Sequence, residues 1–157
     1  MKVAIASETT GYFMKETVKA HLAGLGYEMI DVGATSDNDG TLYYEAAERL
    51  GRLVDTGEAE CGVVICGTGG GVSLVCNAFR NVRAIACESV YTAERIKYIN
   101  NANVLAMGVQ VVGPTMACEM AAKFLAGDWM CDFVPQRKVN NQNGFDKIGQ
   151  IKDEWGK

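Results

Sequence analysis

The feature that most restricts the fold of this chain is an unbroken apolar run at residues 61–66, Cys-Gly-Val-Val-Ile-Cys. A strand with one face in water alternates apolar and polar residues, whereas a strand buried on both faces is apolar throughout. The run therefore predicts a central strand of a parallel sheet that has helices packed on both of its sides.

Segments of two kinds alternate along the chain as far as residue 125. Short apolar segments, which are typical of strands, lie at residues 3–6, 28–32, 61–66, 82–87 and 104–107. Segments with the apolar spacing of helices lie at residues 12–25, 44–55, 71–79, 92–98 and 114–125. Right-handed crossovers join strands of this kind into one sheet. We therefore expect a single Rossmann-like α/β domain, with an open parallel sheet of about five strands and helices on both faces.

The end of the chain has a different composition. Residues 128–157 are polar and rich in asparagine, and they also carry the apolar residues Phe145, Ile148, Ile151 and Trp155. Apolar side chains outside a core need cover from another surface. We expect an α/β domain at residues 1–127 and a C-terminal extension at residues 128–157 that packs on the domain or on a partner subunit. The protein is accordingly expected to be a homodimer or a larger homo-oligomer.

The composition argues against several classes of function. The net charge is −4 and no run of Lys or Arg is present, so nothing favours nucleic acid as a partner. No apolar stretch is long enough to cross a membrane. The six cysteines include no CxxC pair and only one histidine accompanies them, which favours reduced thiols over disulfides or a zinc site. We expect a cytoplasmic protein without a metal, a cofactor or a membrane partner.

In an open parallel sheet, ligands bind where the strands end at their carboxyl termini. The segments that follow the five expected strands are residues 7–10, 33–43, 66–71, 88–91 and 108–110. The third of these, Cys66-Gly-Thr-Gly-Gly-Gly71, is the strongest candidate because glycines let backbone N–H groups approach a ligand closely. It is neither the GxGxxG fingerprint of dinucleotide-binding folds nor a Walker loop, which needs a following Lys.

Cys66 ends the third strand and precedes the start of a helix, where the partial positive charge favours thiolate over thiol. A thiolate at this place can act as a base, with Thr68 and the backbone amides stabilising the charge that forms. The competing interpretation is a buried structural cysteine before an ordinary helix-opening turn. We expect the other buried thiols, at Cys61, Cys76, Cys87 and Cys118, to be structural.

The sequence resembles the ribose-5-phosphate isomerase B group, which also contains the two subunits of galactose-6-phosphate isomerase. The resemblance runs from Met1 to about residue 125. It is carried by Gly11, Lys15-Glu16, Asp31-Val-Gly33, Ile65-Cys-Gly-Thr-Gly-Gly-Gly71, Ser73, Asn77, Val82-Arg-Ala84, Tyr91-Thr-Ala93, Asn100-Asn-Ala-Asn-Val-Leu105 and Val111-Val-Gly113.

The resemblance implies a parallel α/β fold, dimers with active sites between subunits, and metal-free transfer of a proton between C1 and C2 of a sugar phosphate through a cis-enediolate. It makes Cys66 the base and gives the enediolate oxygen to Thr68 and the turn. The residues that it implies in substrate binding are Glu8, Thr9, Tyr43, Gly67, Gly69, Gly70, Gly71, Asn100 and Arg137. Glu8 replaces an Asp of the family pattern, and Arg137 is a partial counterpart of a C-terminal Arg pair.

Three departures from the pattern point to a changed substrate. Thr9 replaces a His, Ile99 replaces the His assigned to ring opening, and Gln110 replaces an Arg that binds phosphate. We expect an aldose–ketose isomerase that acts on a small sugar, sugar phosphate or sugar acid, with ribose 5-phosphate as a poor substrate. Two alternatives remain open: a sugar epimerase, and a non-catalytic partner subunit of a heteromeric isomerase.

Overall fold

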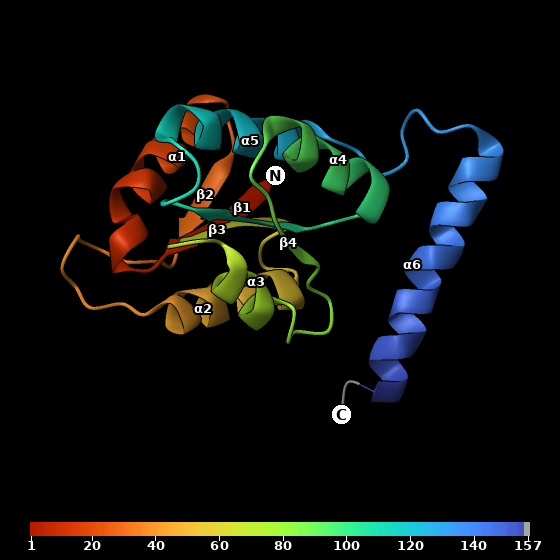
Figure 1. Cartoon of the computed structure of the whole chain (residues 1–157), viewed down its shortest axis with the longest axis horizontal. Helices are drawn as coiled ribbons and strands as arrows, with labels where there is room; N and C mark the ends of the chain where they lie inside the picture. The colour runs from red at the N-terminus through yellow and green to blue at the C-terminus, as the bar shows by residue number, and fades with distance from the viewer. Residues whose placement is uncertain (156–157) are drawn as a thin grey trace.

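A computed structural model, which describes residues 1–155, has one parallel sheet of five strands at its centre (Figure 1). The strands lie side by side in the order β2-β1-β3-β5-β4. They are β1 (Lys2–Ser7), β2 (Glu28–Asp31), β3 (Cys61–Cys66), β4 (Ala84–Ala86) and β5 (Val104–Gly108). The expected Rossmann-like α/β fold is confirmed, and the apolar run that led to it forms the middle strand.

Helices cover both faces of the sheet (Figure 1). One layer contains α1 (Tyr12–Gly24), α4 (Val90–Asn100) and α5 (Pro114–Ala126), and a short 3-10 turn, η1 (Thr9–Gly11), precedes α1. The other layer contains α2 (Tyr43–Thr56) and α3 (Gly70–Cys76).

Two hydrophobic cores lie on the two faces of the sheet, and successive residues of β3 alternate between them. Val63 and Ile65 point into the core with α1, α4 and α5, whereas Val64 and Cys66 point into the core with α2 and α3. All four side chains are at most 5% exposed. Burying an aliphatic side chain of this size stabilises a fold by roughly 1.5–3 kcal/mol. This two-sided burial explains why the strand has no polar residue.

The segment between α3 and β4 is longer than the sequence pattern predicts. The Asn77 side chain donates to the carbonyl of Ala84 and accepts from its N–H, both at 2.8 Å. An amide side chain that bonds in both directions occupies backbone groups that would otherwise continue a ladder. Accordingly, α3 ends at Cys76 rather than at residue 79, β4 begins at Ala84 rather than at residue 82, and the Asn77 side chain bridges the two elements.

A buried ion cluster ties α1 to β2. Lys15 is only 1% exposed and pairs with Asp31 and with Glu16. Lys19 bonds the same two carboxylates at 2.6 Å. Burial alone would raise the pKa of Asp31, but the hydrogen bonds from Lys15, Lys19 and the Gly33 N–H outweigh it and hold that pKa below its ordinary value.

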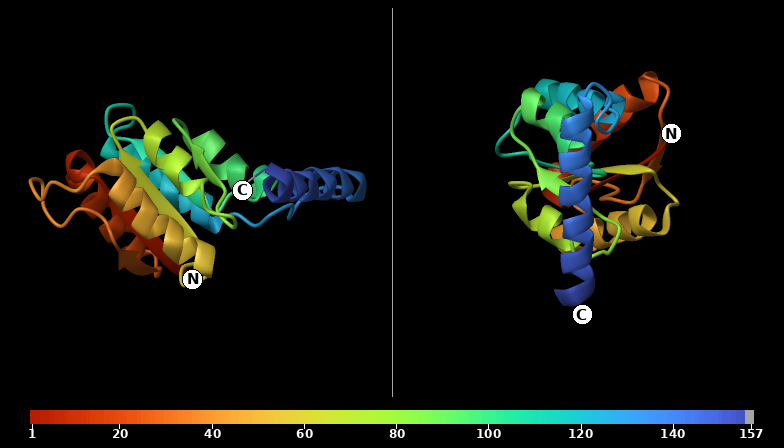
Figure 2. Two further views of the ribbon diagram at one scale, coloured as in Figure 1. Left: turned by 90° about the horizontal axis from the view of Figure 1, so that it is seen from below. Right: turned by 90° about the vertical axis from the view of Figure 1, so that its right-hand side faces the viewer.

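The C-terminal extension contains a long helix, α6 (Pro135–Trp155), which the sequence pattern did not lead us to expect. This helix lies beside the two helical layers rather than within either of them (Figures 1 and 2). Lys152 donates to the carbonyls of Phe79, Arg80 and Val82, and Asn141 donates to the carbonyl of Ile99. Ile148 and Ile151 remain about half exposed, at 51% and 47%. The extension therefore contacts the domain and still presents apolar surface.

No helix within residues 1–155 has the length and apolar character needed to cross a membrane. The six cysteines are all free thiols. Cys61, Cys76 and Cys87 are buried, as expected of structural residues, whereas Cys118 is only partly buried.

Candidate active site

The two central strands, β1 and β3, mark the point where the direction of winding changes. The chain leaves β1 towards β2 on one side, and it leaves β3 towards β5 and β4 on the other. Loops that diverge in this way open a crevice at the carboxyl ends of the strands. A hollow of about 240 Å³ lies there, lined by Glu8, Tyr43, Cys66, Gly67, Thr68 and Gly71. The sequence-predicted turn after β3 therefore does line a pocket.

Cys66 lies at the bottom of this pocket and is 5% exposed. The Gly69 N–H donates to its sulfur, with 3.1 Å between N and Sγ. Gly69 has a φ of +82°, a left-handed conformation that favours glycine, and this conformation turns its N–H back towards the sulfur. A backbone donor at this position stabilises negative charge on the sulfur.

The thiols elsewhere in the domain have surroundings of a different kind. Burial raises the pKa of Cys76 to about 12 and that of Cys87 to about 11. Cys76 donates only a long hydrogen bond, of 3.6 Å, to the carbonyl of Ala47. Neither residue lines the pocket around Cys66.

Some glycine N–H groups of the turn already donate to acceptors within the protein, which the sequence does not reveal. The Gly67 N–H donates to Oε1 of Glu8 at 2.8 Å, and the Gly69 N–H is the donor to Cys66. The Gly70 N–H makes a long bond of 3.4 Å to the Thr68 hydroxyl. Two of the glycine amides implied by the resemblance, those of Gly67 and Gly69, therefore already have acceptors within the subunit. Gly71 makes none of these contacts.

Tyr43, the first residue of α2, forms one wall of the pocket. Its ring lies so close to Gly71 that a Cβ on that glycine would be 2.9 Å from the ring atom Cε2. Any side chain at residue 71 would push the ring away. Glu8 also lines the pocket, and its carboxylate accepts a hydrogen bond from the Gly67 N–H.

Thr9 does not line the pocket, although the resemblance makes it a substrate-binding residue. Its hydroxyl lies 3.1 Å from both Oδ1 of Asp39 and the carbonyl of Thr41. The hydroxyl is thus directed towards the loop that joins β2 to α2. Asp39 was not among the residues singled out in the sequence, although it lies in a polar stretch of that loop.

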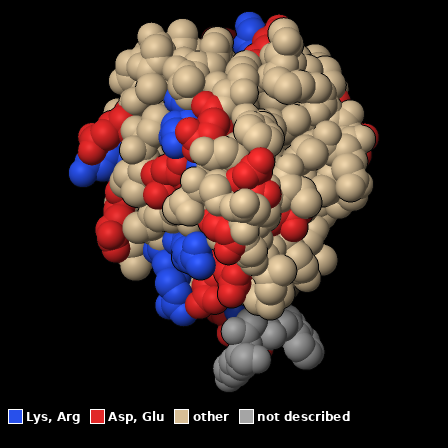
Figure 3. Space-filling model, turned by 90° about the vertical axis from the view of Figure 1, so that its left-hand side faces the viewer, with Lys and Arg blue, Asp and Glu red and all other residues tan. Residues whose placement is uncertain are grey.

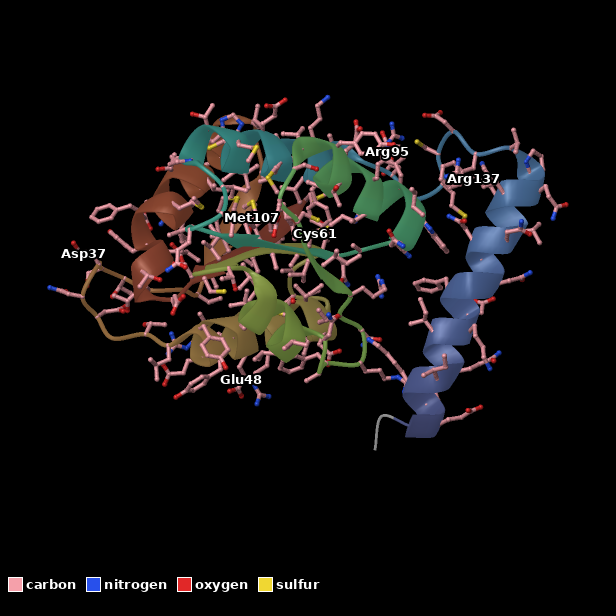
Figure 4. The ribbon with its side chains drawn as sticks, viewed as in Figure 1. Asp37, Glu48, Cys61, Arg95, Met107 and Arg137 are labelled. Atoms are coloured by element: carbon pink, nitrogen blue, oxygen red, sulfur yellow. The ribbon has the colours of Figure 1, made fainter. Side chains whose placement is uncertain are left out.

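Asn100 and Arg137 lie at the other edge of the sheet. Asn100 ends α4, just before the start of β5, whereas Cys66 pairs with Gly108 at the end of β5. Arg137 is an exposed residue of α6, with its guanidinium 3.8 Å from the centre of the Phe133 ring. Figure 4 shows Arg137 and the Asp37 loop at opposite ends of the molecule. Asn100 and Arg137 therefore do not line the Cys66 pocket of their own subunit.

This opposite edge has a hollow of its own, of about 200 Å³. It is lined by Ile99, Asn100, Asn140, Asn141, Gly144, Phe145 and Ile148. One subunit therefore carries two separate surfaces with polar residues: the pocket around Cys66 at the carboxyl edge, and the hollow around Asn100 at the amino edge.

Gln110 is a pocket neighbour whose contacts the sequence could not reveal. Its backbone N–H donates to the carbonyl of Gly67 at 3.0 Å. Its side-chain amide nitrogen would lie 3.7 Å from a Cβ placed on Gly67. A neutral amide group therefore lies beside the turn that contains Cys66, where the family pattern has a cation.

Exposed apolar side chains are frequent at the carboxyl edge. Five of them lie at or next to helix N-termini that follow strands: Phe13, Leu42, Tyr43, Tyr44 and Tyr91. Uncharged residues also make up much of the face shown in Figure 3. Exposed apolar groups that gather around a polar pocket are typical of a surface that becomes covered.

Comparisons with known proteins agree with this geometry. The family model described as Ribose/Galactose Isomerase matches residues 3–142. The 4-deoxy-4-sulfo-D-erythrose isomerase of Clostridium sp. strain MSTE9 is 39% identical over 153 residues, which cover 98% of this chain and 96% of the relative. Ribose-5-phosphate isomerase B of Escherichia coli K12 is 36% identical over 129 residues, covering 82% of this chain and 83% of the relative.

A solved structure is similar along the whole chain. Ribose-5-phosphate isomerase B of Clostridium thermocellum superposes with a TM-score of 0.89 at 31% identity, covering 99% of both chains.

Proposed function

Because the chain belongs to the ribose/galactose isomerase family and is a sugar isomerase, we propose that it interconverts an aldose and its ketose with Cys66 as the group that moves the proton. The observation that carries this assignment is the Gly69 N–H on the Cys66 sulfur, at the bottom of a pocket placed at the switch point of the sheet. The same sulfur, buried in a core, would lack such a donor.

In the proposed reaction the Cys66 thiolate removes the proton from C2 of the aldose. The electron pair forms the C1–C2 double bond of an enediolate, whose oxygen takes the charge. The thiol then returns the proton to C1, and the hydroxyl proton on O2 passes to O1. General bases that are held in position typically accelerate such a step by about 10²- to 10⁴-fold.

The remaining pocket residues have supporting roles in this proposal. Thr68 and the Gly71 amide stabilise the enediolate oxygen, since the amides of Gly67 and Gly69 are already engaged. The Glu8 carboxylate, anchored through Oε1, uses its second oxygen for a sugar hydroxyl.

We propose a four-carbon sugar with an anionic substituent on C4 as the substrate. A tetrose closes into a five-membered ring only through its C4 hydroxyl, and a substituent there prevents closure. A substrate that is always open needs no ring-opening acid, which agrees with Ile99 in place of a His. The relative that acts on 4-deoxy-4-sulfo-D-erythrose has this chemistry, and its similarity covers 98% of the chain.

The proposal also concerns the charge of the group on C4 of the substrate. Gln110 offers hydrogen bonds without a charge where the family pattern has an Arg. A guanidinium holds a phosphate dianion better than an amide does. The neutral residue therefore favours a C4 sulfonate, a monoanion, over a C4 phosphate.

We propose that the residues at the amino edge contribute to the active site of a second subunit. In a homodimer, the Asn100 and Arg137 surface of one subunit covers the Cys66 pocket of the other. The exposed apolar residues at the carboxyl edge support this arrangement because an interface would cover them. The isolated subunit is then incomplete, and substrate binding requires assembly.

A substrate panel tests the proposal. The purified chain is incubated in D₂O with 4-deoxy-4-sulfo-D-erythrose, D-erythrose 4-phosphate and D-ribose 5-phosphate, and NMR follows ketose formation and deuterium at C1. We expect the sulfonate to react fastest and ribose 5-phosphate to react at least about tenfold more slowly. Turnover of ribose 5-phosphate within tenfold of the best substrate contradicts the proposed substrate. Binding of a tetrose without any turnover supports the non-catalytic subunit instead.

A further inference from the structure

One carboxylate, that of Asp39, organises the loop at residues 33–42 that joins β2 to α2. Its Oδ2 accepts from the Thr35 N–H at 2.6 Å and from the Thr35 hydroxyl at 3.1 Å. Its Oδ1 accepts from the Thr41 N–H at 2.9 Å and from the Thr9 hydroxyl at 3.1 Å. Three contacts lie within the loop, and the fourth reaches the segment after β1.

These contacts connect two walls of the pocket around Cys66. Thr9 directly follows Glu8, the residue that holds the Gly67 amide, and the Thr9 N–H donates to the carbonyl of Thr41 at 3.0 Å. Thr41 lies two residues before Tyr43, whose ring packs on Gly71. Asp39 thus bonds directly to Thr9, which follows Glu8, and to Thr41, which lies two residues before Tyr43.

The charge state of Asp39 suits this role. The backbone amides of Thr35 and Thr41 hold the pKa of Asp39 well below its ordinary value. The carboxylate is therefore ionised and able to accept hydrogen bonds at neutral pH.

These contacts lie outside the two hydrophobic cores of the domain. Residues 37–41 of the loop are not buried, and Asp39 itself is exposed. The next helix, α2, has a start signal of its own, because the Leu42 N–H donates to Oε2 of Glu45 at 3.0 Å. What Asp39 restricts is the freedom of the loop between two pocket walls.

We propose that Asp39 is a positioning residue of the active site: through Thr9 and Thr41 it sets Glu8 and Tyr43 against the Cys66 turn. This inference rests on the proposed function, since it takes the pocket as the substrate site. An ordered loop lowers the entropy that binding must remove. Asp39 therefore acts on substrate affinity and not on the proton transfer itself.

The test compares Asp39→Ala with Asp37→Ala, a matched acidic residue in the same loop. Asp37 lies at the outer tip of the loop, on the far side from α6 (Figure 4). With the fastest substrate of the panel, we expect Asp39→Ala to raise KM about tenfold and to leave kcat within about twofold. Asp37→Ala should keep the KM and kcat of the unmodified chain.

Two further variants separate positioning from folding. Asp39→Asn keeps the size and one acceptor oxygen, so its KM should lie between those of the parent and of Asp39→Ala. Thr9→Val removes the hydroxyl contacts to Asp39 and to the carbonyl of Thr41, while the Thr9 N–H keeps its bond to that carbonyl. When Thr9→Val is combined with Asp39→Ala, the further rise in KM should be smaller than the rise that Thr9→Val causes alone. Both changes break the contact between Thr9 and Asp39. Melting temperatures should differ little among these proteins.

An unchanged KM in Asp39→Ala overturns the inference, and so does an equal rise in Asp37→Ala or a loss confined to kcat. The Cys66→Ser variant distinguishes a failure of this inference from a failure of the proposed function. If Cys66→Ser is inactive while Asp39→Ala is normal, only the role of Asp39 is wrong. If Cys66→Ser is fully active, the proposed chemistry is wrong.

Discussion

The carboxyl edge and the amino edge of the sheet differ in how far contacts within the subunit hold their proposed functional groups in place. At the carboxyl edge, Cys66 is buried, its sulfur has a backbone donor, and Glu8 is anchored on the neighbouring amide. At the amino edge, Asn100 and Arg137 are exposed residues, and Arg137 contacts an aromatic ring rather than a carboxylate. The difference teaches that the groups proposed for chemistry are organised within one subunit. Of the groups proposed for substrate binding, Glu8 lies in the same pocket, whereas Asn100 and Arg137 lie outside it.

The largest effect is expected at the carboxyl edge. Cys66→Ser replaces the thiol by a hydroxyl that loses its proton far less readily, so kcat should fall by at least about 10²-fold, or ~2.7 kcal/mol of barrier. KM should change little because the amides and Glu8 remain. Steady-state kinetics on the best tetrose measures both values.

Cys76→Ser is the matched control for this change. Cys76 is buried at the other end of α3 and does not line the pocket. Its replacement should lower stability more than turnover. Near-native turnover of Cys66→Ser would contradict the assignment and make Glu8 the next candidate for the base.

The next largest effect concerns the stability of the carboxyl edge. Asp31→Asn removes the charge that pairs with the buried Lys15, and we expect it to lower the free energy of unfolding by about 2 kcal/mol at neutral pH. Because the pKa of Asp31 is lowered in the fold, its contribution is present above the ordinary carboxyl pKa and is lost as pH falls through the lowered value. The difference between variant and parent should therefore shrink in acid.

Denaturant unfolding at several pH values measures this effect. Glu28→Gln is the control, since the Lys2–Glu28 pair is exposed and should contribute less than about 0.5 kcal/mol. An equal loss in both variants would show that the burial of Lys15 does not matter.

A smaller effect is expected at the amino edge. Asn100→Ala should lower kcat/KM about tenfold, the value of one hydrogen bond to substrate. If the sites are shared, mixing inactive Cys66→Ser with Asn100→Ala subunits should produce dimers with one intact site. Activity after mixing should then approach about a quarter of the parent value. Activity that stays at the level of the separate variants would place each site within one subunit.

The smallest effect concerns α6. Ile151 is 47% exposed on this helix, and Ile151→Ser should weaken self-association by about 1 kcal/mol, or roughly fivefold in Kd. Leu25→Ser, which changes an exposed residue at the end of α1, is the control. Light scattering over a dilution series measures the shift. A monomeric parent protein at micromolar concentration would contradict the shared-site arrangement as a whole.

The sequence predicted the fold well because its strongest signals come from burial. Residues 61–66 have no polar side chain since both faces of β3 are covered, and this places Cys66 at a strand end. The helix α6 was missed for the opposite reason. Its apolar residues Phe145, Ile148 and Ile151 have helical spacing, but Gly149 lies among them and the stretch before them, residues 140–144, is rich in Asn and Gly, which are poor helix formers.

The site was predicted in part. The strand-end rule found Cys66, Glu8 and Tyr43, which share a pocket. It could also have separated Asn100 from them, because a residue between a helix and the start of β5 must lie at the amino edge. The direction of the Thr9 hydroxyl and the acceptors of the Gly67 and Gly69 amides depend on side-chain geometry between distant segments. No pattern along the chain carries that information.

The strand order has a consequence for how the protein forms during synthesis. In the order β2-β1-β3-β5-β4, the first three strands can pair with one another as soon as they leave the ribosome. The fourth cannot, because its single neighbour in the sheet is β5, which is made after it. The nascent chain therefore holds an unpaired β4 until residues 104–108 have emerged, and a chain stopped before that point exposes a strand edge open to aggregation. The Cys66 turn is made before β4, and the α6 helix is made after β5.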